Sequence, residues 1–124
     1  MDITPKINPK KNTIESYGDK GIEVKEKFYN KTIIIDPDNI KEIEVLDLEE
    51  FLNQNASKYI NKQDEILVIG TGNSHKIINI NIKNKIKAQF KNISISEMSS
   101  DSACRTYNIL AFEQRNVKAI ILPF

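Results

Sequence analysis

The single cysteine of the chain stands beside an arginine, just after a cluster of small hydroxyl side chains. The stretch is Ser-Ser-Asp-Ser-Ala-Cys-Arg, residues 99–105. Serine and aspartate are the residues that cap helices, because their oxygens accept from the free amides of the first turn. A helix start and the neighbouring Arg105 would both favour a Cys104 thiolate. Cys104 is therefore either a nucleophile or a small buried hydrophobic residue.

A second stretch with chemical potential is the turn Gly70-Thr71-Gly72, which follows a continuous apolar run. Glycine lets a backbone approach a phosphate, and the amides of such a turn can bind negative charge. The third glycine of the dinucleotide pattern is His75 here, and the lysine and hydroxyl pair of a P-loop is missing. The turn is therefore either a tight end to a strand or a site for a small anion.

His75 is the only imidazole of the chain, so Cys104 and His75 form the one dyad of nucleophile and base that can be considered. The alternative is that His75 is a solvated loop residue. One histidine, one cysteine and scattered acids show no metal-ligand spacing, and we predict neither a metal nor a cofactor.

The residues that follow the cysteine also allow two interpretations. Arg105 could clamp an incoming anion, or it could hold Asp101 or a local carbonyl in place. Tyr107 is expected on the inner face of the helix. Asn108 is unusual in the middle of a helix, where it competes with the backbone, so we expect it to make a specific contact.

Strands and helices alternate around both stretches, which predicts an α/β fold with a mixed sheet and a parallel strand-helix-strand-helix-strand core. A β-rich layer comes first, and we expect its hairpin to extend the core sheet. The expected elements are a hairpin turning at residues 18–21, strands at 32–35 and 40–46, a helix begun by Asp47 and Glu50 with an apolar stripe from Leu48 to Ile60, a strand at 65–70, a weaker helix containing Ile82, Ile86 and Phe90, a strand at 93–98, a helix with Ala103, Tyr107, Leu110 and Ala111 inside, and a strand at 117–122.

Ligands of open α/β sheets bind outside the carboxyl ends of the parallel strands. The loops at residues 70–76 and 99–105 each follow one core strand. If those strands are neighbours, the two loops lie together, and the site is expected there.

Composition limits the classes of function. The 124 residues, with 40% hydrophobic letters, suit one domain at residues 13–124, preceded by a flexible arm at 1–12 that contains Pro5 and Pro9. A net charge of +1 implies neither nucleic acid nor an anionic membrane as partner. Without an apolar run of about 18 residues or a targeting segment, we predict no membrane insertion and a bacterial cytoplasmic location.

Several stretches together resemble one known family. They are YGDKGIEV, FYNKTIIIDP, ILVIGTG, EMSSDSACRTYNIL and VKAIILP. The family is that of the mitochondrial NADH dehydrogenase alpha subcomplex assembly factor 3 and the adipogenesis-associated domain protein. The resemblance spans about Ile14 to Pro123, and residues 103–108 are its most specific part. Gln114 stands where the family commonly has glycine.

The resemblance implies a three-layer fold whose central mixed sheet has one strand running against the rest. It implies no established enzymatic activity, because the best-understood members act as assembly factors through protein contacts. We therefore expect a non-enzymatic domain that binds a protein partner, and a homodimer is compatible with the sequence. The alternative is a protein that binds or transforms a small anionic metabolite, with the Gly72 and Ser102 amides as donors, Arg105 as clamp and Cys104 as a possible nucleophile. The predicted site residues are Gly70, Thr71, Gly72, Ser100, Ser102, Cys104, Arg105, Tyr107 and Asn108.

Overall fold

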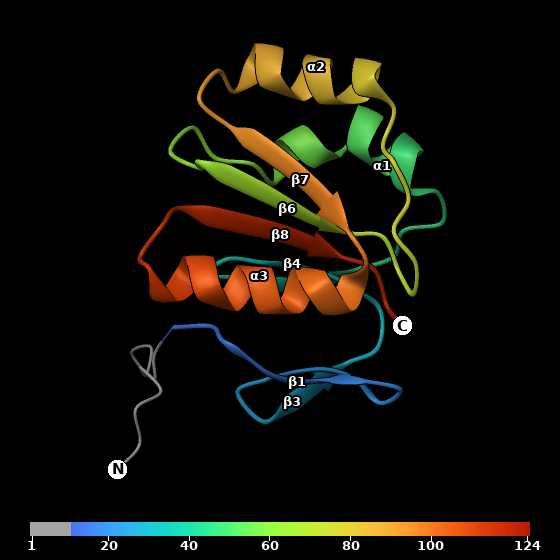
Figure 1. Ribbon diagram of the computed structural model, residues 1–124, viewed down its shortest axis with the longest axis vertical. Helices are drawn as coiled ribbons and strands as arrows, with labels where there is room; N and C mark the ends of the chain where they lie inside the picture. Colours follow the sequence, from blue (N-terminus) through green and yellow to red (C-terminus); the bar gives the residue numbers. More distant parts are fainter. Residues whose placement is uncertain (1–10) are drawn as a thin grey trace.

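The computed structural model describes residues 11–124, which fold into eight strands, three α-helices and one 3-10 helix (Figure 1). In chain order these are β1 (Ile14–Gly18), β2 (Gly21–Val24), β3 (Lys27–Tyr29), β4 (Thr32–Ile35), β5 (Ile40–Ile43), α1 (Leu48–Gln54), η1 (Ala56–Lys58), β6 (Ile66–Gly70), α2 (Ile80–Gln89), β7 (Ser94–Met98), α3 (Ser100–Phe112) and β8 (Val117–Ile121).

The central sheet has five strands in the order β5-β4-β8-β6-β7. Strand β6 runs parallel to β7 and β8, while β4 is antiparallel to both β8 and β5. Strand β4 is thus the single strand that opposes the rest. The mixed α/β sheet and its parallel core are confirmed.

The first hairpin does not extend this sheet, and that expectation is wrong. Strands β1, β2 and β3 form a separate three-stranded sheet, which lies beneath α3 in Figure 1. Its apolar residues Ile14, Ile22 and Val24 belong to the same core as Tyr107 of α3, so the small sheet buries its apolar face there. The central sheet is extended instead by the β4–β5 hairpin.

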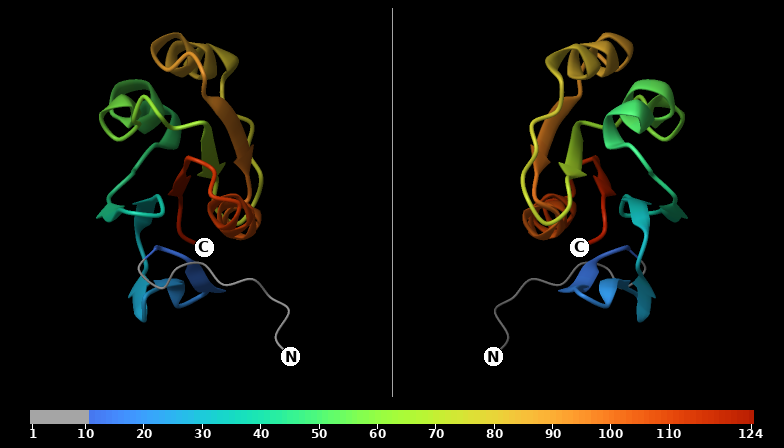
Figure 2. Two further views of the ribbon diagram at one scale, coloured as in Figure 1. Left: turned by 90° about the vertical axis from the view of Figure 1, so that its left-hand side faces the viewer. Right: turned by 90° about the vertical axis from the view of Figure 1, so that its right-hand side faces the viewer.

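Both faces of the central sheet carry buried apolar residues, because its inner strands β4, β6 and β8 are buried on both sides. Figure 2 shows α1 and α3 on opposite sides of this sheet. On one face, Val68 and Ala119 pack with α3 and the small sheet. On the other face, Leu67 and Ile69 pack with α1 and α2. The domain therefore has three layers: α3 with the small sheet, the central sheet, and α1 with α2.

Two elements are shorter than their sequence patterns predict. Strand β5 ends at Ile43, because its neighbour β4 begins at Thr32, the register partner of Ile43, and offers no further pairing. The helix begun by Asp47 ends at Gln54 and continues as the 3-10 helix η1. Ala56 and Ile60 of the predicted stripe nevertheless reach the core beside the helices.

The segment before β1 is part of the domain from Asn12 onwards. The backbone amide of Asn12 donates to the carbonyl of Pro37 (2.8 Å), and its side-chain amide donates to the carbonyl of Asp36 (3.0 Å). Asn12 is only 3% exposed. The first ten residues of the predicted arm lie outside the described residues, so the arm itself stays a prediction.

Candidate functional site

The loops after β6 and β7 lie together, as their place behind neighbouring parallel strands predicts. The amide of Gly72 donates to Ser100 Oγ (2.9 Å), and the amide of Ser100 donates to the Gly72 carbonyl (2.8 Å). Ser100 Oγ in turn donates to the carbonyl of Leu122 (2.6 Å). A Cβ on Gly70 would come within 2.9 Å of Ser100 Oγ and 3.0 Å of the Ala103 Cβ. Glycine therefore serves the close approach of α3 to the sheet.

The backbone groups proposed for an anion already have partners inside the protein. The Gly72 amide is taken by Ser100, and the Ser102 amide donates to Asp101 Oδ1 (2.8 Å). Thr71 is buried, and its hydroxyl donates to the carbonyl of Ser74 (2.6 Å) and accepts from the amide of Lys76 (3.0 Å). Of the two interpretations of this turn, the structure matches the tight end to a strand.

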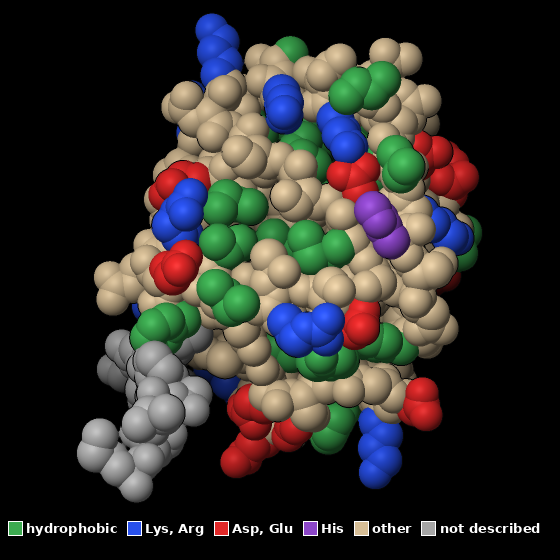
Figure 3. All heavy atoms as spheres, in the orientation of Figure 1, with side chains coloured by type: hydrophobic (Ala, Val, Ile, Leu, Met, Phe, Trp, Pro, Cys, Tyr) green, Lys and Arg blue, Asp and Glu red, His purple; other side chains and the backbone are tan. Residues whose placement is uncertain are grey.

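Of the two interpretations of Cys104, the structure matches the small buried hydrophobic residue. The side chain is fully buried in the core beneath α3. Burial, the largest influence, raises the pKa of the thiol from its ordinary value of 9.0 to about 12; the charge of Asp101 adds to this rise and that of Arg105 opposes it. His75, the purple side chain in Figure 3, lies exposed at the surface, so the dyad does not form.

Of the two interpretations of Arg105, its contacts within the protein match the structural tie. Its guanidinium donates to the hydroxyl of Tyr17 on β1 (2.6 Å) and to Ser102 Oγ (3.2 Å), and it lies 3.8 Å from Asp101 Oδ2. The ring of Tyr17 stacks on that of Phe124 with centroids 5.6 Å apart. The tie to Asp101 was expected, whereas nothing in the sequence indicated Tyr17.

Tyr107 and Asn108 join α3 to the start of the chain. The buried hydroxyl of Tyr107 donates to the carbonyl of Asn12 (2.8 Å). The side-chain amide of Asn108 donates to the Ile14 carbonyl (2.8 Å), and its oxygen accepts from the Ile14 amide (2.9 Å). The specific contact expected of Asn108 is therefore confirmed, and it is structural.

A cluster of buried charges that the sequence analysis missed lies at the opposite end of the sheet. Lys118 Nζ on β8 lies 2.7 Å from Asp36 Oδ2, after β4, and 3.8 Å from Asp64 Oδ2, before β6. The three residues are between 5% and 8% exposed. Asp36 Oδ1 also accepts from the amides of Asp38 (2.8 Å) and Asn39 (2.7 Å). We call Asp36, Lys118 and Asp64 the charge triad.

The pKa values of the two carboxylates of the triad are shifted in opposite directions. Burial is the largest influence on Asp36 and raises its pKa, but the hydrogen bonds from Lys118, Asp38 and Asn39 together hold that pKa below its usual range. Burial also raises the pKa of Asp64, and the bond from the Asn61 amide and the charge of Lys118 do not fully offset it. Asp64 is thus the less satisfied carboxylate.

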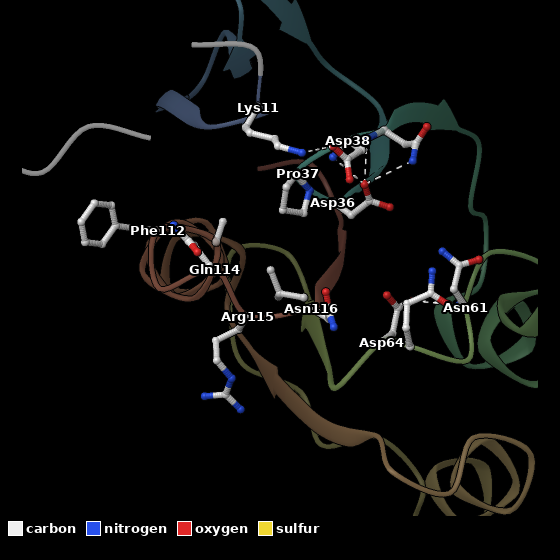
Figure 4. Close-up of a pocket in the computed structure, with 14 residues that line it drawn as sticks. Lys11, Asp36, Pro37, Asp38, Asn61, Asp64, Phe112, Gln114, Arg115 and Asn116 are labelled. Atoms are coloured by element: carbon white, nitrogen blue, oxygen red, sulfur yellow. Dashed lines mark hydrogen bonds and ion pairs between the residues drawn. The ribbon is translucent and has the colours of Figure 1, made fainter. Parts of the chain in front are cut away.

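A cavity of about 550 Å³ opens beside the triad (Figure 4). Asp36, Asp64 and Asn116 line it, close to the amino ends of β6 and β8. This is the end of the parallel strands opposite to the predicted site. A lysine inside the apolar run of β8 and aspartates next to two other apolar runs were the signals that could have indicated it.

Two kinds of feature are absent from residues 11–124. No three His, Cys, Asp or Glu side chains in this part of the chain gather in a way that could hold a metal ion. None of its helices has the length and apolar character needed to span a bilayer.

The fold and the satisfied signature residues define a class: small three-layer α/β domains in which a short β-sheet and a helix share one face of a five-stranded sheet. The model of the family described as protein of unknown function (DUF498/DUF598) matches residues 14–122, and the chain belongs to that family. A relative from Francisella tularensis subsp. holarctica (strain LVS), named 13 kDa major membrane protein, is 32% identical over 96 residues, which is 76% of each chain.

Solved structures repeat the fold. An outer membrane protein from Bartonella henselae has a TM-score of 0.73 at 27% identity, covering 93% of this chain and 97% of its own. A protein from Bordetella parapertussis reaches 0.79 at 29% identity, covering 92% and 97%. A Bordetella pertussis protein described as a Mth938-like domain also reaches 0.79, at 21% identity with 99% and 92% covered, and its likeness shows the fold alone.

Proposed function

We propose that this chain is a non-enzymatic domain that binds another protein and acts in assembling a membrane complex. The observation that carries the proposal is a group of exposed apolar side chains beside the loop after β6. Ile77 is 83% exposed, Ile80 is 62% exposed, and Leu46, just before α1, is 93% exposed. Exposed apolar groups of this kind are typical of protein interaction sites.

These side chains share one end of the molecule. Asn79, between the two isoleucines, donates its amide to Glu49 Oε2 on α1 (2.8 Å), three residues after Leu46. The adjoining residues 73–77 are all exposed, and they belong to the loop that follows Gly70-Thr71-Gly72. We call Leu46, Ile77 and Ile80 the apolar end. Residues 103–108, whose polar side chains bond within the protein, would then stabilise the fold that carries this surface and would take part in no reaction.

Two further findings support the choice of a membrane complex. Relatives from Francisella and Bartonella carry the names of membrane proteins. The resemblance to the family of the complex I assembly factor suggests a respiratory complex as the assembly. We propose that the chain meets this partner from the bacterial cytoplasm. A homodimer stays a prediction, which light scattering of the purified chain would test.

The test is a matched pair of variants in the source organism. Ile77→Asp combined with Ile80→Asp places charge on the apolar end, while Ile109→Asp alters a comparably exposed isoleucine (59%) on α3. We expect cross-linking to capture a partner with the wild type and Ile109→Asp but not with the double variant. In a strain that lacks the protein, native gels should show that the wild type and Ile109→Asp restore a respiratory complex and that the double variant does not. Identical capture and assembly with all three chains would refute the proposal.

A further inference from the structure

The cavity beside the charge triad has the lining of a ligand site, and protein binding at the apolar end does not use it. Its volume of about 550 Å³ lies in the range of small-molecule sites. Four carboxamide side chains that line it make no hydrogen bond within residues 11–124: Asn61, Gln63, Gln114 and Asn116. Pro37, Ala111 and Val117 supply an apolar part of the wall.

Asp64 presents an unpartnered oxygen in this cavity. Its Oδ2 accepts from the Asn61 amide (2.8 Å) and faces Lys118 Nζ (3.8 Å), but its Oδ1 receives no hydrogen bond from any described residue. The residue is only 6% exposed. No fully buried side-chain nitrogen or oxygen among the described residues lacks a partner, so this oxygen is open to the cavity and can accept from a donor that comes from outside the chain.

The charged side chains that line the cavity are the three carboxylates of Asp36, Asp38 and Asp64 and the two cations of Lys11 and Arg115. Asp36 has its own cation in Lys118 (2.7 Å), Asp38 pairs with Lys11, and Arg115 pairs with Glu65 (3.3 Å). Asp64 has only the longer contact with Lys118 Nζ (3.8 Å), which already pairs closely with Asp36. Figure 4 also shows the guanidinium of Arg115 extending away from the cavity.

The end of α3 adds to this negative potential. Phe112 closes the helix and lines the cavity, as do Gln114 and Arg115 immediately after it. The C-terminal end of a helix carries partial negative charge and stabilises nearby cations. A cation is therefore preferred over an anion or a neutral ligand.

We propose that the cavity binds a primary ammonium group, which donates to Asp64 Oδ1 and to the oxygens of the surrounding carboxamides. The attached alkyl chain lies along Pro37, Ala111 and Val117. A guanidinium fits less well, because bidentate pairing needs both carboxylate oxygens and Oδ2 of Asp64 is already occupied. The ammonium group belongs to a small free amine or to the lysine side chain of a partner.

The experiment is a titration of the isotope-labelled full chain, followed through its backbone amide resonances at neutral pH. The probe is putrescine, and butanediol is its uncharged counterpart of equal chain length. We expect saturable shifts at Asn61, Asp64 and Asn116 with putrescine and none with butanediol. Asp64→Asn should weaken putrescine binding about tenfold or more, because a charged hydrogen bond is lost.

Two controls keep this result interpretable. Asp64→Asn retains an oxygen for the Asn61 amide and leaves the pair of Asp36 and Lys118 intact, so its resonances should report the native fold. Asp19→Asn changes an exposed carboxylate between β1 and β2 that does not line the cavity, and it should bind putrescine like the wild type.

A parallel titration with N-acetyl-lysine amide separates the two sources of the ammonium group. Tighter binding of this compound assigns the site to a partner's lysine, and tighter binding of putrescine assigns it to a free amine. Absence of saturable shifts with both compounds, equal response to butanediol, or unchanged affinity in Asp64→Asn would each overturn the proposal.

Discussion

The polar residues of the signature stretch hold the protein together instead of facing a substrate. Asn108 replaces a strand partner for Ile14, since its side chain satisfies both the amide and the carbonyl of that residue. This pairing explains why asparagine stands at a helix position where its propensity is poor. The cost of that propensity is offset by closing the edge of β1 against α3.

We therefore expect Asn108→Ala to lower the free energy of unfolding by about 2 kcal/mol, because two backbone groups of Ile14 lose their partners. Urea unfolding followed by circular dichroism measures the loss. Ile109→Ala, at the next and exposed position of α3, should change stability by less than about 0.5 kcal/mol. Equal stability of Asn108→Ala and the wild type would contradict the structural role.

The buried thiol of Cys104 gives a second test at the same scale. Because burial first of all raises its pKa from 9.0 to about 12, the group is neutral near pH 8, and iodoacetamide should modify the native chain only very slowly. Arg105→Ala should leave that rate unchanged. A raised folded pKa also means that the thiol's contribution to stability is present below pH 9.0 and is lost as pH rises toward about 12.

The matched control for Cys104 is an exposed thiol at Lys91→Cys in a Cys104→Ala background, which should react quickly. A native Cys104 that reacts as fast as this control, and slows when Arg105 is removed, would restore the thiolate hypothesis.

At the scale of elements, the charge triad ties together three strands that are distant in sequence. Asp36 ends β4, Asp64 precedes β6, and Lys118 lies within β8 between them in the sheet. Lys118 Nζ lies at hydrogen-bond distance from Asp36 (2.7 Å) but farther from Asp64 (3.8 Å). Removing Lys118 leaves two buried carboxylates without a cation, although each still accepts from backbone amides. This loss costs more free energy of unfolding than breaking an exposed ion pair.

Lys118→Met should therefore destabilise the protein by about 3 kcal/mol at neutral pH, as measured by urea unfolding. Lys11→Met is the matched control, since its pair with Asp38 is 41% and 67% exposed, and it should cost less than about 1 kcal/mol.

The loss in Lys118→Met should depend on pH with a definite sign. In the wild type, the lowered pKa of Asp36 stabilises the fold above pH 3.8, and this contribution is lost as pH falls. Without Lys118 the folded pKa values of Asp36 and Asp64 both rise, so the folded variant takes up protons more readily than the folded wild type. The difference in unfolding free energy between wild type and variant should shrink toward acid pH. A difference that stays constant would show that lost packing, not charge, destabilises Lys118→Met.

At the scale of the whole molecule, the sequence predicts the core sheet well because its inner strands β4, β6 and β8 are mostly apolar runs such as residues 66–70. The place of the first hairpin was missed, since the pattern of Ile14, Ile22 and Val24 says that one face is buried but not against which element. Gln114 shows a similar limit. It adopts φ 61°, a backbone conformation that favours glycine, yet glutamine stands at this position just after α3.

The charge triad was missed for a different physical reason. The periodicity of apolar residues predicts which side chains are buried. A buried lysine within an apolar strand needs acidic partners, and periodicity does not identify them. Those partners follow β4 and precede β6, so only the topology brings them to Lys118. Loop positions after the parallel strands were predicted correctly, because they depend on strand order alone.

The extent of the domain yields the last prediction. Asn12 contributes three hydrogen bonds, to Pro37, to Asp36 and from Tyr107, so the cooperative fold should begin at Asn12 and not at residue 13. A chain whose first residue is Thr13, after removal of the initiating methionine, lacks residue 12 altogether and should unfold with about 2 kcal/mol less free energy than one that starts with methionine followed by Asn12. Urea midpoints of the two truncated chains measure this difference directly. Equal midpoints would place the start of the domain after Asn12, and the buried Tyr107 hydroxyl would then need another acceptor.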